Sequence, residues 1–405
     1  MRVLGMISGT SHDGIDAAIV GFSLNGEELT VRIEHTSSTP YDPALRKQLI
    51  DSLPPAPLGF DVACELDTAI GKAFADAASI ALADHAANNP GQRTQAICSH
   101  GQTVFHWVEN GVARGSLQIG QPAWITERTG LPVISDVRAA DIASGGQGAP
   151  LVPILDVFLL KPFVEQGKKA GALNLGGIAN ATVCSPNADP VAWDIGPANA
   201  LIDAVVTASA EAPGTFDRDG ELARSGSVIP ELLEFFLAEP YYSLPFPKSS
   251  GKELFHGSYV QEALNRLSTS PSLPDLVATL TELTAVTVAE ALVSAGLDVV
   301  IASGGGVRNS FLMERIRALM VGVEVLPSDE VGVPSDDKEA VAFALIGWAT
   351  IHGLPSNVPS CTGASGPRVL GRVNASPSGL FPQAGRLPEW PSRVVFEVDG
   401  RFPND

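Results

Sequence analysis

Apolar residues run from Val3 to Ile7 and again from Ile15 to Val20, and a polar turn of residues 9–14 separates the two runs. This pattern predicts two strands joined in a β-hairpin. The turn contains two glycines, two hydroxyl residues and an acid. Glycines allow a ligand to approach the backbone closely and hydroxyls supply donors, so the turn is typical of a phosphate-binding loop. An ordinary Asp-Gly turn is the alternative, because short glycine-rich motifs are common.

A second segment has the same pattern, because apolar residues 172–175 and 178–183 flank the pair Gly176–Gly177. In both halves of the chain, the hairpin is followed by helical stretches and then by a short apolar strand. That strand ends in a serine, Ser99 in the first half and Ser303 in the second, and a glycine turn follows it. Coincidence among short patterns is the alternative. The repeat predicts two related α/β domains with a nucleotide triphosphate between them.

The other elements follow from apolar periodicity and from breaks at glycine and proline. Apolar residues at three- and four-residue spacing predict helices, and short apolar runs predict strands. We expect helices at residues 61–87, 124–129, 199–208, 276–295, 311–319 and 340–350, and strands at residues 96–99, 132–135, 299–303 and 393–398. The loop 144–150, with three glycines, is the first candidate for a crossing between domains.

Composition narrows the class of function. The chain has 405 residues, 45% of them hydrophobic, and a formal net charge of −19. That negative charge argues against nucleic acid as a partner. Apolar runs are shorter than roughly 18 residues and the N-terminus does not resemble a signal peptide, so neither a membrane span nor secretion is expected. The four cysteines lie far apart, which favours free thiols in the cytoplasm over a zinc site.

Asp194 is the candidate catalytic residue, because it stands at the end of a predicted strand before Gly196-Pro197 and the helix 199–208. A carboxylate beside a glycine-rich cleft can act as a general base. Capping the next helix is the alternative role. The run Gly304–Gly306 precedes the helix 311–319, which favours an anion or a nucleoside beside it, with simple chain reversal as the alternative.

Two further groups are weaker candidates. Glu339 follows other acids in the first turn of the helix 340–350, where the helix dipole already favours acids, so it faces a substrate only if this helix points into the cleft. His100 and His106 flank a Gly-Gln-Thr turn. Two histidines without a third ligand are more typical of structural or substrate-contacting residues than of a metal site.

Taken together, these segments resemble the anhydro-N-acetylmuramic acid kinases, a family with the actin/hexokinase/Hsp70-like ATPase fold. The similar segments follow the family's order and together are far more specific than any one alone. They are Gly9–Asp16, Ser99–Thr103, Gly145–Leu151, Asn174–Asn180, Asp194–Asn199, Pro247–Glu253, Ser303–Gly306 and Thr362–Ala364.

The resemblance implies an α/β fold of two actin-like (RNase H-like) domains, with mixed sheets flanked by helices, that face each other across a nucleotide cleft. The expected bounds are residues 1–138 with 355–405 for the N-terminal domain and 139–354 for the second. The implied reaction is ATP-dependent phosphorylation of 1,6-anhydro-N-acetylmuramic acid with hydrolytic opening of the anhydro ring, in cell-wall recycling. A cytoplasmic homodimer that binds neither nucleic acid nor membrane is expected.

The resemblance also assigns residues. Asp194 would deprotonate the attacking water, and Glu339, Arg138 and Asp141 would contact the sugar. Asp13 would hold Mg²⁺ through water. The expected ATP-binding residues are Gly9, Thr10, Ser11, His12, Asp13, Gly14, Ile15 and Asp16, with Gly176 and Gly177 opposite and Gly304, Gly305 and Gly306 at the nucleoside.

The sequence departs from the family at several positions. His12 stands where many members carry Leu, and Ala198 replaces a usual glycine. Because alanine resists a positive φ, we expect an ordinary backbone conformation at Ala198. The tail beyond about Ala375 is an extension to which no chemistry is assigned. Alternative functions are a kinase of another anhydro sugar and an actin- or Hsp70-like nucleotide-switched binding protein.

Overall fold

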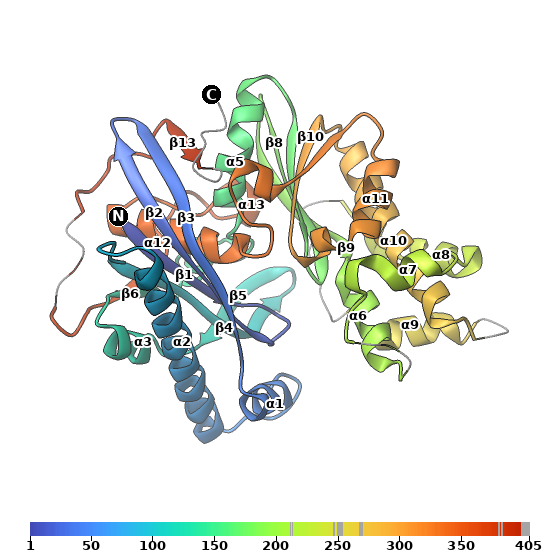
Figure 1. Cartoon of the computed structure of the whole chain (residues 1–405), viewed down its shortest axis with the longest axis horizontal. Helices are drawn as coiled ribbons and strands as arrows, with labels where there is room; N and C mark the ends of the chain where they lie inside the picture. Colours follow the sequence, from blue (N-terminus) through green and yellow to red (C-terminus); the bar gives the residue numbers. More distant parts are fainter. Residues whose placement is uncertain are drawn as a thin grey trace. The chain divides into compact units, whose positions relative to one another are not determined.

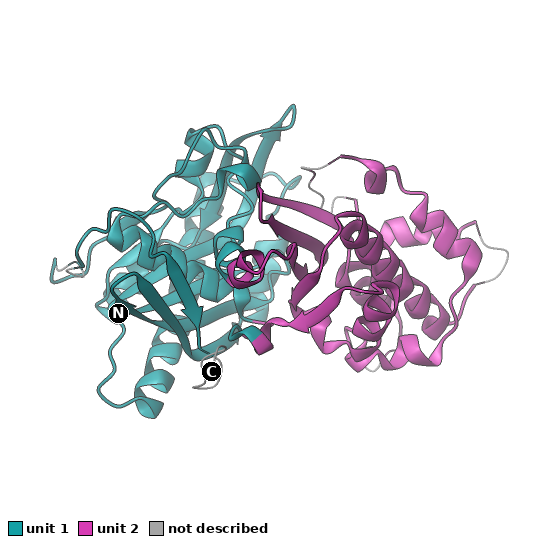
Figure 2. Ribbon diagram, turned by 90° about the horizontal axis from the view of Figure 1, so that it is seen from above, with its two compact units in different colours: residues 1–158, 331–333, 337–405 teal, residues 159–330, 334–336 magenta. Residues whose placement is uncertain are grey.

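The structure is a computed structural model that describes residues 1–210, 212, 214–245, 248, 254–266, 270–379, 381 and 384–397. The chain divides into two compact units, coloured separately in Figure 2. Unit 1 consists of Met1–Phe158, Val331–Val333 and Asp337–Asp405, and unit 2 of Leu159–Glu330 and Pro334–Asp336. The helix α5 (Pro153–Glu165) contains the first passage from one unit to the other.

Unit 1 is built around a mixed sheet in the order β12-β6-β4-β1-β2-β3-β13, with β5 paired to β4. Its long strands β1 and β2 form the hairpin that the apolar pattern predicts. The strands are β1 (Arg2–Ser8), β2 (Gly14–Asn25), β3 (Glu28–Pro40), β4 (Ala96–Glu109), β5 (Val112–Ile119), β6 (Val133–Ser135), β12 (Arg372–Asn374) and β13 (Arg393–Phe396).

Helices cover both faces of this sheet (Figure 1). On one face Leu4 and Met6 of β1 pack with Phe74 of the long helix α2 (Phe60–Asn88). On the other face the backbone of α12 (Lys338–His352) lies against Gly5. The remaining helices of unit 1 are α1 (Pro43–Asp51), α3 (Pro122–Thr129), α4 (Ala139–Ala143) and α13 (Pro359–Thr362).

Unit 2 has a second mixed sheet, in the order β11-β10-β7-β8-β9. Its strands are β7 (Ala170–Leu175), β8 (Ile178–Ser185), β9 (Ala188–Pro197), β10 (Val299–Ser303) and β11 (Glu324–Pro327). Its α-helices are α6 (Asn199–Ala208), α7 (Glu221–Ser225), α8 (Pro230–Leu237), α9 (Gly257–Leu264), α10 (Leu273–Ser294) and α11 (Ser310–Leu319), and its short 3-10 helices are η1 (Arg218–Gly220), η2 (Pro240–Ser243), η3 (Gly305–Arg308) and η4 (Ser328–Val331).

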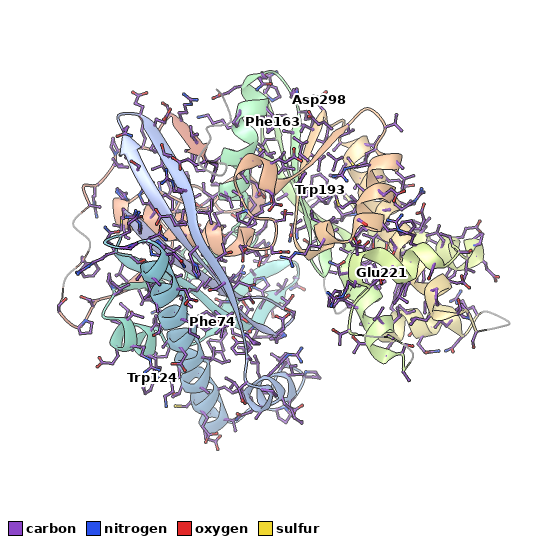
Figure 3. All side chains as sticks on the ribbon, viewed as in Figure 1. Phe74, Trp124, Phe163, Trp193, Glu221 and Asp298 are labelled. Atoms are coloured by element: carbon purple, nitrogen blue, oxygen red, sulfur yellow. The ribbon has the colours of Figure 1, made fainter. Side chains whose placement is uncertain are left out.

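Two apolar cores stabilise unit 2. One lies between the sheet and helices α10 and α11, and it contains Trp193 of β9. Figure 3 labels Trp193, and also Phe74 of the core of unit 1. The other joins α6, α8, α9 and α10 through residues such as Phe236 and Phe255. Helix α10 is long and apolar enough to cross a membrane, but 72% of its most apolar window is buried inside the protein. It is therefore the central core helix of unit 2.

The two sheets share one topology, which confirms the predicted relationship between the halves. In unit 1, β1–β2 and β2–β3 are antiparallel, and β1–β4 and β4–β6 are parallel. In unit 2, β7–β8 and β8–β9 are antiparallel, and β7–β10 and β10–β11 are parallel. The order β6-β4-β1-β2-β3 in unit 1 thus corresponds to β11-β10-β7-β8-β9 in unit 2, with β5, β12 and β13 as additions in unit 1, and the α/β fold class is as expected.

Two expectations differ from the structure. The strand predicted at residues 96–99 continues to Glu109, because it pairs with β5 beyond its buried part, so the expected Gly-Gln-Thr turn lies within β4. The expected domain bounds placed residues 139–158 and 337–354 in the second domain, whereas these residues lie in unit 1. The reason is that α12 packs on β1, β2 and β4.

The C-terminal extension completes unit 1. Strand β13, predicted at residues 393–398, forms at Arg393–Phe396 and pairs in parallel with β3, and Val398 lies outside the described residues. The indole of Trp390 packs against Trp348 of α12 and Phe158 of α5, with ring centroids 5.6 and 4.8 Å apart. The extension thus covers a sheet edge and part of the core.

Replacing Gly5 by alanine should destabilise unit 1. A Cβ atom there would lie 2.0 Å from the Ala340 carbonyl oxygen and 2.4 Å from the Ala344 nitrogen, so strand or helix must move. Overpacking of this kind typically costs about 1–3 kcal/mol of unfolding free energy. Gly385→Ala is the control, because no atom lies within 4 Å of its Cβ position. Equal urea midpoints for the two variants would contradict this packing account.

Candidate functional site

The turn between β1 and β2 has most of its carbonyl oxygens bound by the surrounding chain. The donors lie on β1, β4 and α1 and on Tyr41, which follows β3, so the turn is held from several directions. The bonds are Ser8 Oγ to Gly14 O (2.7 Å), Gln102 Nε2 to Gly9 O (3.2 Å), Arg46 Nη2 to Ser11 O (3.4 Å), Arg46 Nε to His12 O (2.8 Å) and Tyr41 N to Asp13 O (3.0 Å). The His12 N–H adds a bond within the turn, to Gly9 O at 3.3 Å, so these bonds together hold the turn in one shape.

Gln102 is central to this arrangement, although it is not among the predicted site residues. Its side chain is fully buried. Its Oε1 atom lies 2.6 Å from the Ser8 hydroxyl and 3.4 Å from the Tyr41 hydroxyl. The only sequence signal was its place in the segment Ser99–Thr103, and no signal pointed to Arg46.

Individual residues of the turn have different surroundings. His12 has a positive φ of 54°, an uncommon conformation for a residue with a side chain, and Arg46 holds its carbonyl. Asp13 is exposed and accepts a hydrogen bond from the Ser11 hydroxyl at 2.6 Å. The side chain of Ile15 is buried in the core of unit 1, so only its backbone is available to a ligand. Burial raises the pKa of Asp16, with Asp13 and Asp337 adding to the effect and a hydrogen bond from Ser38 opposing it.

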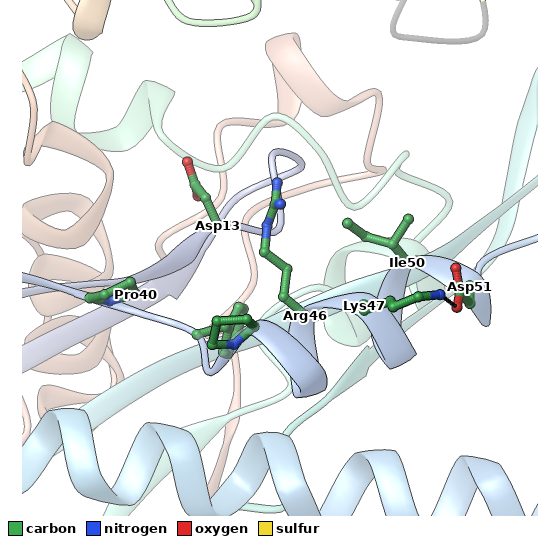
Figure 4. Close-up of a pocket in the computed structure, with 8 residues that line it drawn as sticks. Asp13, Pro40, Arg46, Lys47, Ile50 and Asp51 are labelled. Atoms are coloured by element: carbon green, nitrogen blue, oxygen red, sulfur yellow. Dashed lines mark hydrogen bonds and ion pairs between the residues drawn. The ribbon is translucent and has the colours of Figure 1, made fainter. Parts of the chain in front are cut away.

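A cavity of about 490 Å³ lies beside this turn (Figure 4). Asp13 of the turn and Arg46 of α1 both line it, and so do Pro40 and Tyr41 at the end of β3. Lys47 and Asp51 form an ion pair at its edge. The turn is therefore accessible from this side in unit 1.

The turn between β7 and β8 in unit 2 has a similar arrangement. The N-terminus of α6 binds its carbonyl oxygens. Asn199 Nδ2 donates to Leu175 O (3.1 Å) and Gly176 O (3.0 Å). The amides of Ala198 and Ala200 donate to Gly177 O at 2.9 and 3.0 Å. Both units thus hold the carbonyls of the turn that follows the first strand.

Packing explains some of the glycines in these segments but not others. A Cβ at Gly304 or Gly306 would lie 2.5 to 2.7 Å from Asn174 or Leu175, so contact with β7 requires both glycines. At Gly9, Gly176, Gly177 and Gly305, by contrast, nothing lies closer than 3.5 Å and φ is not positive. Neither chain reversal nor packing requires glycine at these four positions, whereas a ligand against the backbone would.

The helix predicted at residues 311–319 forms as α11 (Ser310–Leu319), but the run Gly304–Gly306 does not lead directly into it. Gly305 and Gly306 begin the 3-10 helix η3, and α11 starts at Ser310, where the Asn309 side chain caps the Leu312 amide at 2.9 Å. The dipole of α11 therefore begins beyond the glycines.

Asp194 lies inside β9 rather than at a strand end, because pairing with β8 continues to Pro197. Its neighbours Trp193 and Ile195 are buried in the core, so the half-buried Asp194 side chain points to the opposite face. The backbone of Asp194 is held on both sides: its N–H donates to Lys248 O at 3.1 Å, and its carbonyl accepts from the Tyr241 hydroxyl at 2.7 Å.

Two other predictions concern residues near Asp194 in unit 2: the backbone conformation of Ala198 and the segment Pro247–Glu253. Ala198 has a negative φ of −111°, as expected, but its ψ of −99° lies outside the helical and extended regions. Of the segment Pro247–Glu253, Lys248 is described: its ammonium donates to the carbonyls of Tyr241 and Tyr242 at 3.0 Å each. Pro247 and residues 249–253 lie outside the described residues.

Arg138 and Asp141 belong to one hydrogen-bonded network in unit 1. The Asp141 carboxylate is fully buried and accepts from Gly148 N (2.8 Å), Asn357 Nδ2 (2.7 Å) and Thr362 Oγ1 (2.8 Å). The Gly148 carbonyl in turn accepts from Arg138 Nη1 at 2.6 Å. Asp141 therefore anchors the loop 144–150, and that loop orients Arg138.

His100 holds the other side of Arg138. Its Nε2 atom accepts from Arg138 Nε at 2.9 Å, and its Nδ1 atom donates to Gly101 O at 3.0 Å, which together define the neutral tautomer. Burial, and then the charge of Arg138, lowers the pKa of His100 to about 3. Burial also lowers the pKa of Arg138, to about 10, while Glu339 and Asp141 oppose that shift.

Glu339 stands in the first turn of α12 and its side chain remains accessible to solvent. Desolvation by the surrounding chain, and then the charge of Asp16, raises its pKa, while Arg138 and Lys338 oppose the shift. Lys338 is itself buried and paired with Asp156 at 2.6 Å. Unit 1 thus gathers Asp16, Arg138 and Glu339, while Asp194 lies in unit 2.

The sequence profile of the family described as "Anhydro-N-acetylmuramic acid kinase" matches residues 1–376. The chain belongs to the anhydro-N-acetylmuramic acid kinase family. Two relatives carry the family name: the protein of Streptomyces coelicolor is 48% identical over 99% of this chain and all of its own length, and that of Rhodococcus erythropolis is 46% identical over 98% and all of its own length.

A glucokinase of the ROK family from Streptomyces griseus, solved with glucose and AMPPNP, is similar in structure at 16% identity. It covers 85% of this chain and 98% of its own, with a TM-score of 0.36, which is too low to support an argument. Membership of the anhydro-N-acetylmuramic acid kinase family therefore rests on the sequence.

The neutral state of His100 predicts a pH dependence of stability. Between the unfolded pKa of 6.5 and the folded value of about 3, the unfolded chain binds a proton that the folded chain does not. Stability should therefore fall as pH drops through this window, by up to about 1.4 kcal/mol per pH unit. Between about pH 6 and pH 5, urea unfolding should show a loss about 1 kcal/mol larger for the wild type than for His100→Gln. Parallel pH curves would contradict this assignment.

Proposed function

We propose that this chain is an ATP-dependent kinase that converts 1,6-anhydro-N-acetylmuramic acid to N-acetylmuramic acid 6-phosphate in the cytoplasm, during recycling of the cell wall. The observation that carries the proposal is the family match over residues 1–376, with relatives of that name aligned over their whole length. All four cysteines are free thiols, which is typical of proteins from a reducing compartment.

In this proposal the ring opens and the phosphoryl group moves in one reaction. Water attacks the anomeric carbon and gives its proton to Asp194, which acts as general base. The bond from the anomeric carbon to the bridging oxygen breaks. That oxygen stays on carbon 6 and attacks the γ-phosphorus, and ADP leaves. The hydrogen bonds to both backbone groups of Asp194 support its role, because a general base must be held in a fixed position.

ATP phosphates would bind at the two turns whose carbonyls the chain already holds, residues 9–14 and Gly176–Gly177. Thr10 and Ser11 of the first turn are exposed and add hydroxyl donors. Gly305 would leave its open side to the nucleoside, with Gly304 and Gly306 shaping the backbone around it. Asp16, beside the first turn, would remain a supporting acid.

Magnesium fits the residues of the first turn. Asp13 is an exposed carboxylate, and oxygen ligands and bound waters are what Mg²⁺ prefers. Asp13 would hold the ion through water, and the bound ion would offset negative charge that develops on the phosphates.

Glu339 and Arg138 would contact the sugar from unit 1. Glu339 is accessible, and Arg138 is oriented by two hydrogen bonds. Asp141 has all its described contacts within the chain, so we give it a positioning role rather than direct contact with the sugar. A homodimer remains a prediction.

Asp194→Asn should lower turnover by about 1,000-fold or more, because the amide cannot accept the proton from water. ATP binding, measured by calorimetry, should stay within about twofold of the wild type. Asp189→Asn is the matched control, since Asp189 is an exposed residue of the same strand. A coupled assay for ADP release measures turnover, and retained activity in Asp194→Asn would remove the assigned role.

The glycines separate ligand contact from packing. Gly176→Ala should raise the KM for ATP by about tenfold or more with little change in thermal stability, because the added methyl group would make only ordinary contacts, 3.5 Å from Asn174 Nδ2 and 3.6 Å from Ile178 O. Gly306→Ala should instead lower the melting temperature, because its Cβ would lie 2.7 Å from that of Leu175. An unchanged KM for ATP in Gly176→Ala would contradict phosphate binding at this turn.

A further inference from the structure

Arg138 lacks a counter-ion among the residues that the structure describes. Its two hydrogen bonds go to the neutral imidazole of His100 and to the carbonyl of Gly148. The carboxylates of Glu339 and Asp141 act on it electrostatically, but neither forms an ion pair with it. Arg138 is half-buried, and a guanidinium that is partly removed from water is normally paired with an anion. An anion supplied by a ligand would complete its surroundings.

The two bonds also fix how the guanidinium is turned. His100 occupies Nε and Gly148 occupies one N–H of Nη1, so the remaining N–H groups lie at the Nη1 and Nη2 end. His100 is 3% exposed and packs against the Phe343 ring, with centroids 4.8 Å apart. Asp141, itself fully buried, holds the loop that carries the Gly148 carbonyl. The free end is therefore presented in one orientation, which suits the planar geometry of a carboxylate.

The proposed substrate has one group that matches this site. Of the polar groups on anhydro-N-acetylmuramic acid, only the carboxyl group is charged near neutral pH. The other anion in the reaction is the ATP phosphate chain, for which the turns at residues 9–14 and Gly176–Gly177 are the proposed binding sites, with glycines at Gly9, Gly176 and Gly177 that packing does not require. The carboxylate is therefore the favoured partner of Arg138.

We infer that Arg138 binds the carboxylate of the sugar acid and makes the enzyme specific for acidic over neutral anhydro sugars, with His100 and Asp141 as positioning residues for its guanidinium. This inference rests on the proposed kinase function. It adds the reason why an acid sugar is selected, since a neutral analogue would leave the desolvated charge of Arg138 without a partner.

A substrate and variant cycle tests the inference. The wild type is assayed with anhydro-N-acetylmuramic acid and with the same sugar carrying a carboxamide in place of the carboxyl group. The wild type should prefer the acid by about 100-fold in kcat/KM. Arg138→Met should lose about 100-fold on the acid and less than about threefold on the carboxamide, so the preference disappears.

The outcomes separate the inference from the function beneath it. A wild type that phosphorylates neither sugar refutes the proposed kinase function. A wild type that uses both sugars equally well refutes the role of Arg138 even if Arg138→Met fails to fold. Equal losses on both sugars in Arg138→Met would also overturn the inference. A raised KM for ATP in Arg138→Met, without a change in sugar preference, would overturn it and would indicate that Arg138 contacts a phosphate instead.

His100 variants test the positioning role. His100→Leu removes the acceptor for Arg138 Nε and should raise the KM for the acid about tenfold or more, with a smaller change in kcat and none in the KM for the carboxamide. His100→Gln keeps an acceptor and should recover part of the loss. His352→Gln is the control, because His352 is also buried in unit 1 but contacts the Trp348 carbonyl at 2.9 Å. Equal effects of His100→Leu on both sugars would show a purely structural role.

Discussion

The account depends on one constraint: in each unit, the chain itself binds the carbonyl oxygens of the turn that follows the first strand of the sheet. In unit 1 the donors are Gln102, Arg46, Ser8 and the Tyr41 amide, and in unit 2 they come from Asn199 and the start of α6. A turn held in one shape in this way can present backbone N–H groups to an anion. Gly9, Gly176 and Gly177 in these turns, and Gly305, have room for a Cβ atom, which agrees with the proposal that a ligand lies against the backbone there.

The repeated topology explains why the same solution occurs twice. Both sheets share one strand order and one set of strand directions, so the turn after the first strand has the same topological place in each. The units then differ in what surrounds that turn. Unit 1 adds the buried network of His100, Arg138 and Asp141, and unit 2 adds Asp194 on a strand held by Tyr241. The two units thus share one sheet topology but place different side chains around the corresponding turn.

The sequence predicted the elements that depend on local periodicity. The hairpins and the helices α2, α6 and α10 form where the apolar spacing predicts them, so tertiary contacts did not change these local preferences. The length of β4 was missed because its outer half, including Phe105 and Trp107, is exposed and pairs only with β5. The start of α11 was predicted to within one residue, whereas the 3-10 helix η3, which Gly305 and Gly306 begin, was not expected.

The candidate site was only partly predictable for a related reason. Asp141 could be selected as an acid in a motif, but its burial depends on Asn357 and Thr362, which lie more than 200 residues away in the chain. Arg46 and Gln102 contact the first turn through tertiary structure alone, and no local pattern marks such contacts. The assignments that rest on family resemblance, Asp194 above all, concern the reaction itself. The fold alone does not identify that reaction, so these assignments remain proposals.

The most direct test of the central claim is to run the reaction of the wild type in water enriched in heavy oxygen and to locate the label by mass spectrometry. The account predicts one labelled oxygen on the anomeric carbon of the phosphosugar and none in its phosphate group, because water attacks carbon 1 and the bridging oxygen attacks phosphorus. Unlabelled product incubated in the same water corrects for exchange at the anomeric position. Label in the phosphate group, or ADP formed without any phosphosugar, would contradict the account.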